Sequence, residues 1–243
     1  MIDESDLIRP HWPCSPRVRA LATTRRGGGS AAPYGTLNLA DHVGDDPARV
    51  RENRARLRRF LPAEPVWLRQ VHQLTVVDAD YAVGAPEGDA AVARRAGTVC
   101  AVLTADCLPL LLCDQDGTVV AAAHAGWRGL AAGVIEQTLA AMNVPSASVR
   151  AWLGPAIGPA AFVVGEDVRR QFIGQDSAAA QAFAPHDGKW LADLYALARL
   201  RLARQGVTAV FGGGDCTFGN PERFYSYRRD GVTGRMASLI WLA

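Results

Sequence analysis

The chain has 243 residues, of which 49% are hydrophobic and 21% charged, and its formal net charge is +2. These values are typical of a globular protein with one large domain or two small ones, and so small a charge gives no reason to expect a nucleic-acid or membrane partner. There are five cysteines and no export signal, which indicates reduced thiols in a cytoplasmic protein.

The first half of the chain combines short apolar runs with one helix. Asp46 followed by Pro47 is typical of an N-cap and a first helical residue, and the helix is expected to end near Leu61, before a proline. Apolar runs that predict strands cover residues 17–24, 66–72, 74–79, 98–104, 108–114 and 118–124.

The second half mixes helices and strands without a strict alternation. Predicted helices cover residues 129–142, 166–173 and 188–205, and predicted strands cover 148–154, 208–213 and 236–242. This order favours an α+β fold, with mixed β-sheets or a β-sandwich packed between outer helices. We expect a single domain over 1–243, with residues 1–16 peripheral to it.

The run LTADCLPLLLCDQDGTVVAAAHAGWRG (103–129) reads as a β-hairpin with a thiol and an imidazole at its open end. If DQDG (114–117) is a four-residue loop, Cys107 lies directly opposite His124. Opposed Cβ atoms in a sheet lie about 4.5–5.5 Å apart. That spacing suits either two ligands of one metal ion or a thiolate–imidazolium pair.

His72, in the QVH motif between two predicted strands, offers a third ligand. A His/Cys/His set with one open coordination position is the composition of a catalytic zinc site. Two alternatives stay open for these residues. Cys107 and His124 are also compatible with plain core positions, and a cysteine beside a histidine is how a thiol nucleophile is built.

Several polar residues near these motifs are candidates for supporting roles. Asp106 adjoins Cys107 and could orient a ligand or act as a general base, although a turn cap is its simpler explanation. Arg25 directly follows a predicted strand, Arg128 lies at a helix start, and Arg229 follows an aromatic run. Each arginine could bind an anion, and each could equally be a surface residue.

Seven motifs together resemble the YfiH-like, or laccase-domain, family, also called the multicopper polyphenol oxidase or purine nucleoside phosphorylase family. They are TTRRGG (23–28), LNL with HVGDDP (37–47), QVH (70–72), TADCLP (104–109), AHAGWRG (123–129), LGPAIG (153–158) and FYSYRRDGVTGRMAS (224–238). The similarity runs from about residue 18 to the C-terminus, and the joint set is far more specific than any one motif.

The resemblance implies a single α+β domain with zinc on His72, Cys107 and His124. It also implies phosphorolysis of adenosine, inosine, guanosine and S-methyl-5'-thioadenosine, and hydrolytic deamination of adenosine. In this interpretation Asp106 is a candidate proton shuttle, and Cys107 and His124 are also catalytic. Expected substrate contacts are Arg25, Asn38, Gln70, Arg128 and Arg229.

The partners expected from this resemblance are therefore small molecules, purine nucleosides and phosphate, with no nucleic acid and no membrane. A Cys–His amide hydrolase that edits peptidoglycan precursors is the main alternative function. A copper polyphenol oxidase ranks below it, because such enzymes need several clustered coppers and many histidines, and this chain has five histidines in all. A nucleoside-binding protein without catalysis is a further alternative.

Overall fold

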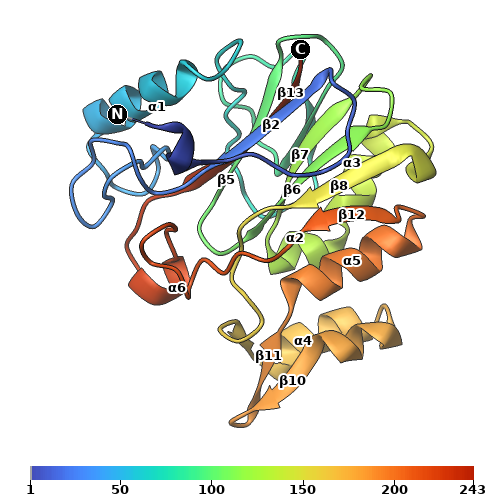
Figure 1. Ribbon diagram of the computed structural model, residues 1–243. Helices are drawn as coiled ribbons and strands as arrows, with labels where there is room; N and C mark the ends of the chain where they lie inside the picture. The colour runs from blue at the N-terminus through green and yellow to red at the C-terminus, as the bar shows by residue number, and fades with distance from the viewer. Residues whose placement is uncertain (1) are drawn as a thin grey trace.

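The computed structural model describes residues 2–243 and contains three β-sheets (Figure 1). The first has the order β1 (Leu7–Ile8), β2 (Val18–Thr23), β13 (Met236–Leu242), β5 (Val99–Thr104). The second has the order β12 (Ala209–Gly212), β8 (Val149–Leu153), β6 (Leu108–Asp114), β7 (Val120–Ala125), β4 (Ala90–Ala93), β3 (Val76–Asp78). The third is small, with the order β10 (Phe183–His186), β11 (Lys189–Ala192), β9 (Val163–Val164).

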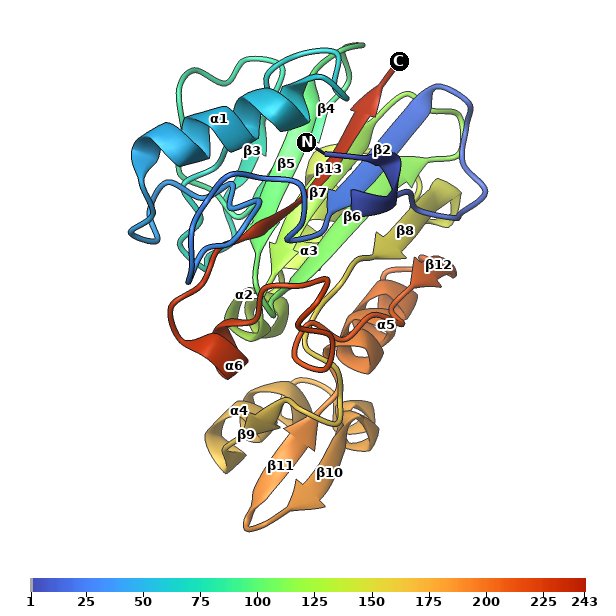
Figure 2. The same ribbon diagram turned by 60° about the vertical axis from the view of Figure 1, so that its left-hand side comes forward.

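Six α-helices surround these sheets (Figures 1 and 2). They are α1 (Pro47–Arg58), α2 (Trp127–Ala132), α3 (Val134–Met142), α4 (Glu166–Ile173), α5 (Leu194–Arg204) and α6 (Tyr227–Asp230). Short 3-10 helices cover Glu4–Asp6, Ser146–Ser148 and Ser177–Ala182. No helix among the described residues has the length and apolar character needed to cross a bilayer.

The two large sheets pack face to face, and helices cover their outer faces. Successive side chains of β13 alternate between the two faces of its sheet. Leu239 packs toward α1, and Ile240 packs between the sheets. Strand β6 does the same, with Leu111 between the sheets and Leu110 against α2, α3 and α5. Side chains alternate across a strand, so burial on both faces explains why these strands read as unbroken apolar runs. The predicted α+β sandwich between outer helices is confirmed.

Most predicted elements are present, and the differences have local causes. Residues 66–72 form isolated bridges in place of a strand, and His72 adopts a left-handed φ of 61°. The predicted helix 129–142 divides at Gly133, whose φ of 110° ends α2 before α3 begins. The predicted helix 188–205 begins only at Leu194, because residues 189–192 form β11. Strand β4 was not predicted, since its four residues Ala90–Ala93 include three alanines with little β-propensity.

The hairpin of β6 and β7 exists, but its register differs from the predicted one by two residues. His124 pairs with Pro109, and Cys113 pairs with Val120, so Cys107 is diagonal to His124 and not directly opposite. The physical reason is the turn, in which the Asp114 carboxylate accepts hydrogen bonds from the backbone N–H groups of Thr118 and Val119. A shift of two residues keeps each side chain on its face of the sheet, so the two predicted ligands still lie on the same side.

Candidate metal centre

Three potential ligands converge at the open end of the β6–β7 hairpin. The ligand atoms of His72, Cys107 and His124 all lie within 4.8 Å of one another. Cys107 Sγ is 4.0 Å from His72 Nε2, and the two imidazole rings are 4.7 Å apart, centroid to centroid, at 78°. Bonds of about 2.0–2.3 Å from nitrogen and sulfur to zinc require donor atoms this close together. The set therefore fits one ion and leaves further coordination positions open.

Gly126 keeps the space between the three candidate ligands free of side-chain atoms. A Cβ at this position would lie 2.9 Å from Cys107 Sγ, 3.3 Å from His72 Cδ2 and 3.5 Å from His124 Nε2. Its backbone, with φ −58° and ψ 156°, is open to any L residue. Glycine is needed at Gly126 for room and not for backbone conformation.

The Asp89 side chain is hydrogen-bonded both to the ring of His124 and to the backbone of His72. Its carboxylate is fully buried and accepts a hydrogen bond of 2.8 Å from His124 Nδ1, which leaves Nε2 of that ring directed at the ligand cluster. It also accepts from the backbone N–H groups of Val71, His72 and Gln73, at 3.1, 3.0 and 2.7 Å. Burial alone raises the pKa of Asp89, but the hydrogen bonds from His124 and the Gln73 and Val71 backbone outweigh it and lower that pKa.

Cys107 and His124 favour each other's charged forms. Burial raises the pKa of the Cys107 thiol, but the nearby His124 and His72 outweigh it and lower that pKa to about 6. Burial lowers the pKa of His124, while the Cys107 thiolate and the Asp89 carboxylate raise it to about 9. Both shifts favour the thiolate form of Cys107, which is the form that binds metals and attacks electrophiles.

The three candidate ligands lie in a cleft of ≈ 390 Å³, whose lining includes Gln70 among the predicted substrate contacts. The Gln70 amide is held by Leu103, donating to its carbonyl at 2.9 Å and accepting from its N–H at 2.7 Å. The cleft lining also includes His42, Tyr227 and Arg235, which were not predicted.

Two other predicted residues support the cleft from outside its lining. Asp106 accepts hydrogen bonds of 2.6 Å from the Thr217 hydroxyl and from the backbone N–H of Arg228, so it fixes helix α6 beside the cleft. Asn38 is fully buried and accepts from the backbone N–H of Arg235 at 3.0 Å. Both side chains use their oxygens to hold segments that carry cleft residues.

The three predicted arginines do not line this cleft. Arg25 donates to the carbonyls of Gly35 and Pro221, at 3.0 and 2.9 Å. Arg229 donates to backbone carbonyls of residues 217, 218 and 224 and to the carboxylate of Asp230. Arg128 is exposed, and its guanidinium lies 4.4 Å from the ring centroid of Trp127.

A signal for the missed residues was present in the sequence. Tyr227 and Arg235 belong to the same FYSYRRDGVTGRMAS motif as Arg229, and His42 begins the HVGDDP motif. Sequence alone could not tell which arginine of the long motif faces the cleft. Asp89 had no such signal, because it lies in the ordinary loop sequence EGDA.

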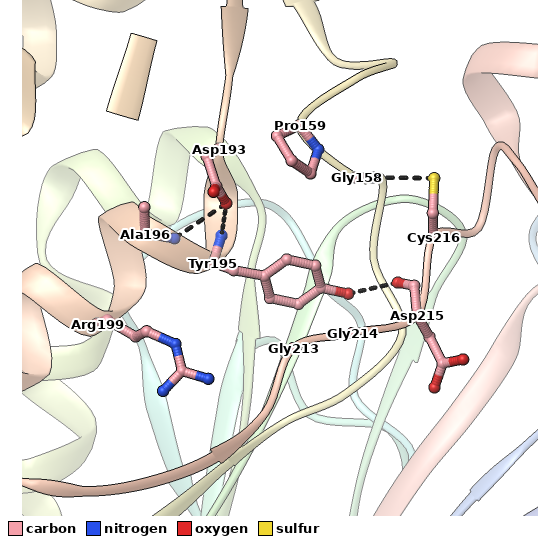
Figure 3. A pocket seen from close by; sticks show the side chains of 10 residues that line it. All are labelled: Gly158, Pro159, Asp193, Tyr195, Ala196, Arg199, Gly213, Gly214, Asp215 and Cys216. Carbon is pink, nitrogen blue, oxygen red and sulfur yellow. Dashed lines mark hydrogen bonds between the residues drawn. The ribbon is translucent and has the colours of Figure 1, made fainter. Parts of the chain in front are cut away.

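A second cleft, of ≈ 280 Å³, lies beside α5 and shares no lining residue with the first (Figure 3). It contains Cys216, whose sulfur accepts from the Gly158 N–H at 3.2 Å. The Tyr195 hydroxyl donates to the Asp215 carbonyl at 2.6 Å, and Arg199 donates to the Gly212 carbonyl at 2.7 Å. These polar groups already have hydrogen-bond partners within the protein.

Comparison with known proteins gives one consistent result. The family described as multi-copper polyphenol oxidoreductase laccase matches residues 19–243. A purine nucleoside phosphorylase of Pseudomonas aeruginosa is 54% identical over 97% of this chain and 98% of its own. Purine nucleoside phosphorylase YfiH of Escherichia coli K12 is 53% identical, over 98% of this chain and 99% of its own.

A crystal structure of a Neisseria meningitidis protein has the same fold, with a TM-score of 0.95 at 52% identity, covering 98% of this chain and 99% of that one. The predicted family resemblance is confirmed over nearly the whole length. The chain therefore belongs to the multi-copper polyphenol oxidoreductase laccase family, together with the YfiH proteins.

Proposed function

We propose that this protein is a zinc-dependent purine nucleoside phosphorylase that also deaminates adenosine. The observation that carries the proposal is the His72–Cys107–His124 set in a cleft that Arg235 also lines. The names of the relatives above support the reaction class. Its test is phosphate-dependent release of hypoxanthine from inosine, with loss of that activity when zinc is removed.

Zinc suits this donor set better than copper. One thiolate and two imidazoles are the ligand types of catalytic zinc sites, and such an ion supplies Lewis acidity to oxygen atoms of a reactant. A multicopper oxidase needs several clustered metal sites. Among residues 2–243, the His72–Cys107–His124 set is the one group of three or more metal-ligating side chains.

Arg235 is our candidate for the phosphate anchor. Its side-chain hydrogen bonds to described residues, to the carbonyls of Thr233 and Gly234, both come from Nη1. Nε and Nη2 therefore remain for two parallel bonds to phosphate oxygens, the geometry that guanidinium favours. From the cleft wall, this cation would direct phosphate toward the anomeric carbon of the ribose and offset its negative charge.

Tyr227 is our candidate for binding the purine base, and His42 is our candidate for proton transfer. Tyr227 is 60% exposed at the cleft edge, and the Arg235 guanidinium lies 5.8 Å from its ring centroid. A purine could stack on this ring. His42 is the cleft histidine outside the ligand set, with Nδ1 3.5 Å from the Asp41 carboxylate. A protonated imidazole can act as a general acid and donate its proton to a leaving purine nitrogen.

Replacing Arg235 by methionine is expected to raise the KM for phosphate by roughly 100-fold, because two charge-assisted hydrogen bonds of about 1.5 kcal/mol each are lost. The KM for inosine should change less than about threefold, as the nucleoside loses no direct partner. Steady-state rates with phosphate and inosine varied separately provide both constants.

Arg128→Met is the matched control, because Arg128 is exposed on Trp127 and does not line the cleft. It should leave the KM for phosphate unchanged. A phosphate KM that rises in Arg128→Met and stays constant in Arg235→Met would mean that the anion binds elsewhere.

A thiol hydrolase is the second candidate function. The Cys107 thiol, with its pKa lowered to about 6 beside His124, is also suited to attack an amide carbonyl. Such an enzyme would act without metal and would be inactivated by a thiol alkylator. The phosphorylase should lose activity on chelation, so the two functions differ in one measurement.

A further inference from the structure

We propose that Asp89 is a positioning residue that holds both histidine ligands in place, so that the affinity for zinc depends on a carboxylate that is not itself a ligand. The inference concerns metal binding and rests on the metal centre of the proposed function. The names of the relatives concern activity and do not concern Asp89. This residue acts through the Nδ1 nitrogen of His124 and through the backbone of residues 71–73.

The geometry joins two segments that are distant in sequence. Oδ1 of Asp89 accepts from His124 Nδ1 on β7 at 2.8 Å and from the His72 N–H at 3.0 Å. Oδ2 accepts from the N–H groups of Gln73 and Val71 at 2.7 and 3.1 Å. The buried Asp89 side chain therefore contacts the ring of His124 and the backbone of His72.

The backbone of Asp89 also joins the start of β4 to β7. Its own backbone carbonyl accepts from the His124 N–H at 2.7 Å, directly before β4 pairs with β7. His72 meanwhile has a φ of 61°, a left-handed conformation that is uncommon for a residue other than glycine. Three N–H bonds to one carboxylate explain how the segment 71–73 retains that conformation and presents the His72 ring to the cleft.

A carboxylate is required because all four groups that face it are donors. An ionised carboxylate only accepts, with capacity for two bonds on each oxygen. An asparagine amide offers one acceptor and one donor group, so one of its two orientations places NH₂ against the Val71 and Gln73 N–H groups. The other orientation places NH₂ against His124 Nδ1, which then becomes the acceptor and moves the ring proton to Nε2, the nitrogen directed at the ligand cluster.

Asp89→Asn is therefore expected to weaken zinc binding by roughly 10- to 100-fold, the range typical for residues that orient metal ligands. The probe is Zn²⁺ itself, titrated into metal-free full-length protein in competition with a chromogenic chelator. Co²⁺ gives a second readout, because the intensity of its visible absorption reports the coordination geometry that a misaligned His124 or His72 would alter.

Asp114→Asn is the matched control on the same hairpin. Asp114 is also a buried carboxylate that accepts three hydrogen bonds, from Thr118 N, Thr118 Oγ1 and Val119 N at 2.7, 2.7 and 3.0 Å, but it lies at the closed end. We expect it to lower the Tm and to leave the zinc affinity and the Co²⁺ spectrum as in the wild type. Equal weakening of zinc binding in both variants would mean a general loss of stability, and would overturn the role of Asp89.

A measurement on the wild type covers the case in which Asp89→Asn does not fold. Nitrogen-15 NMR of the histidine side chains in the zinc-loaded protein should show His124 protonated at Nδ1 and not at Nε2. Protonation at Nε2 would overturn the inference. Wild-type protein without affinity for zinc would refute the proposed function itself, whereas tight zinc binding that Asp89→Asn leaves within twofold would refute only the role of Asp89.

Discussion

Cys107→Ala is expected to lower the phosphorolysis of inosine by roughly 10³-fold and to abolish the binding of zinc. Without the thiolate, the site keeps two imidazoles, His72 and His124, which hold zinc poorly on their own. A Lewis acid at the reacting group is worth several kcal/mol, and a loss of about 4 kcal/mol corresponds to roughly 10³-fold in rate. Chromatographic separation of adenosine, adenine, inosine and hypoxanthine follows both proposed reactions in one assay with adenosine and phosphate.

Cys113→Ala is the appropriate control for this variant. Cys113 lies on β6, the strand that directly follows Cys107, and packs fully buried between the two sheets, with its pKa raised to about 12 chiefly by burial. It should cost some stability and retain full turnover. Equal turnover in Cys107→Ala and wild type would refute the assignment of the site.

Gly126→Ala is expected to reduce zinc binding and turnover by at least about 100-fold while the protein remains folded. The added methyl carbon would lie 2.9 Å from Cys107 Sγ and 3.5 Å from His124 Nε2, in the space that an ion bonded to both atoms requires. The fold should persist because the Gly126 backbone, with φ −58°, accepts alanine without strain. Zinc content per folded chain, together with the circular dichroism spectrum, measures both expectations.

Gly214→Ala is the control for the glycine substitution. Nothing lies within 4 Å of a Cβ at Gly214, which lines the second cleft. This variant should bind zinc as the wild type does. If Gly126→Ala also retained full zinc content, the ion would have to be bound somewhere other than between these three side chains.

The hairpin shows why the predicted ligand candidates lie together despite a wrong register. The side-chain repeat of a strand is two residues, so a two-residue error leaves Cys107 and His124 on one side of the sheet. A one-residue error would have separated them. The turn decides the register, and its capping by Asp114 could not be read from an apolar pattern.

The residues that support the site could not be predicted from the sequence, because their roles depend on contacts between distant segments. Asp89 is set in a loop without any recognisable motif, and its four donors come from two other segments. The arginines illustrate the opposite case, in which the motif was recognised but the arginine that faces the cleft was not identified. Arg25 and Arg229 stand in the right motifs, yet their guanidinium groups are bound to backbone carbonyls, while Arg235 of the same long motif lines the cleft.

The most direct test of the zinc phosphorylase is removal and return of the metal. Purified full-length protein is assayed for release of hypoxanthine from inosine in phosphate buffer before chelation, after chelation, and after addition of one equivalent of Zn²⁺. We expect about one zinc per chain, phosphate-dependent release, loss of activity on chelation and recovery with zinc. Full activity in the metal-free protein, abolished by a thiol alkylator, would contradict this account and identify Cys107 as a nucleophile.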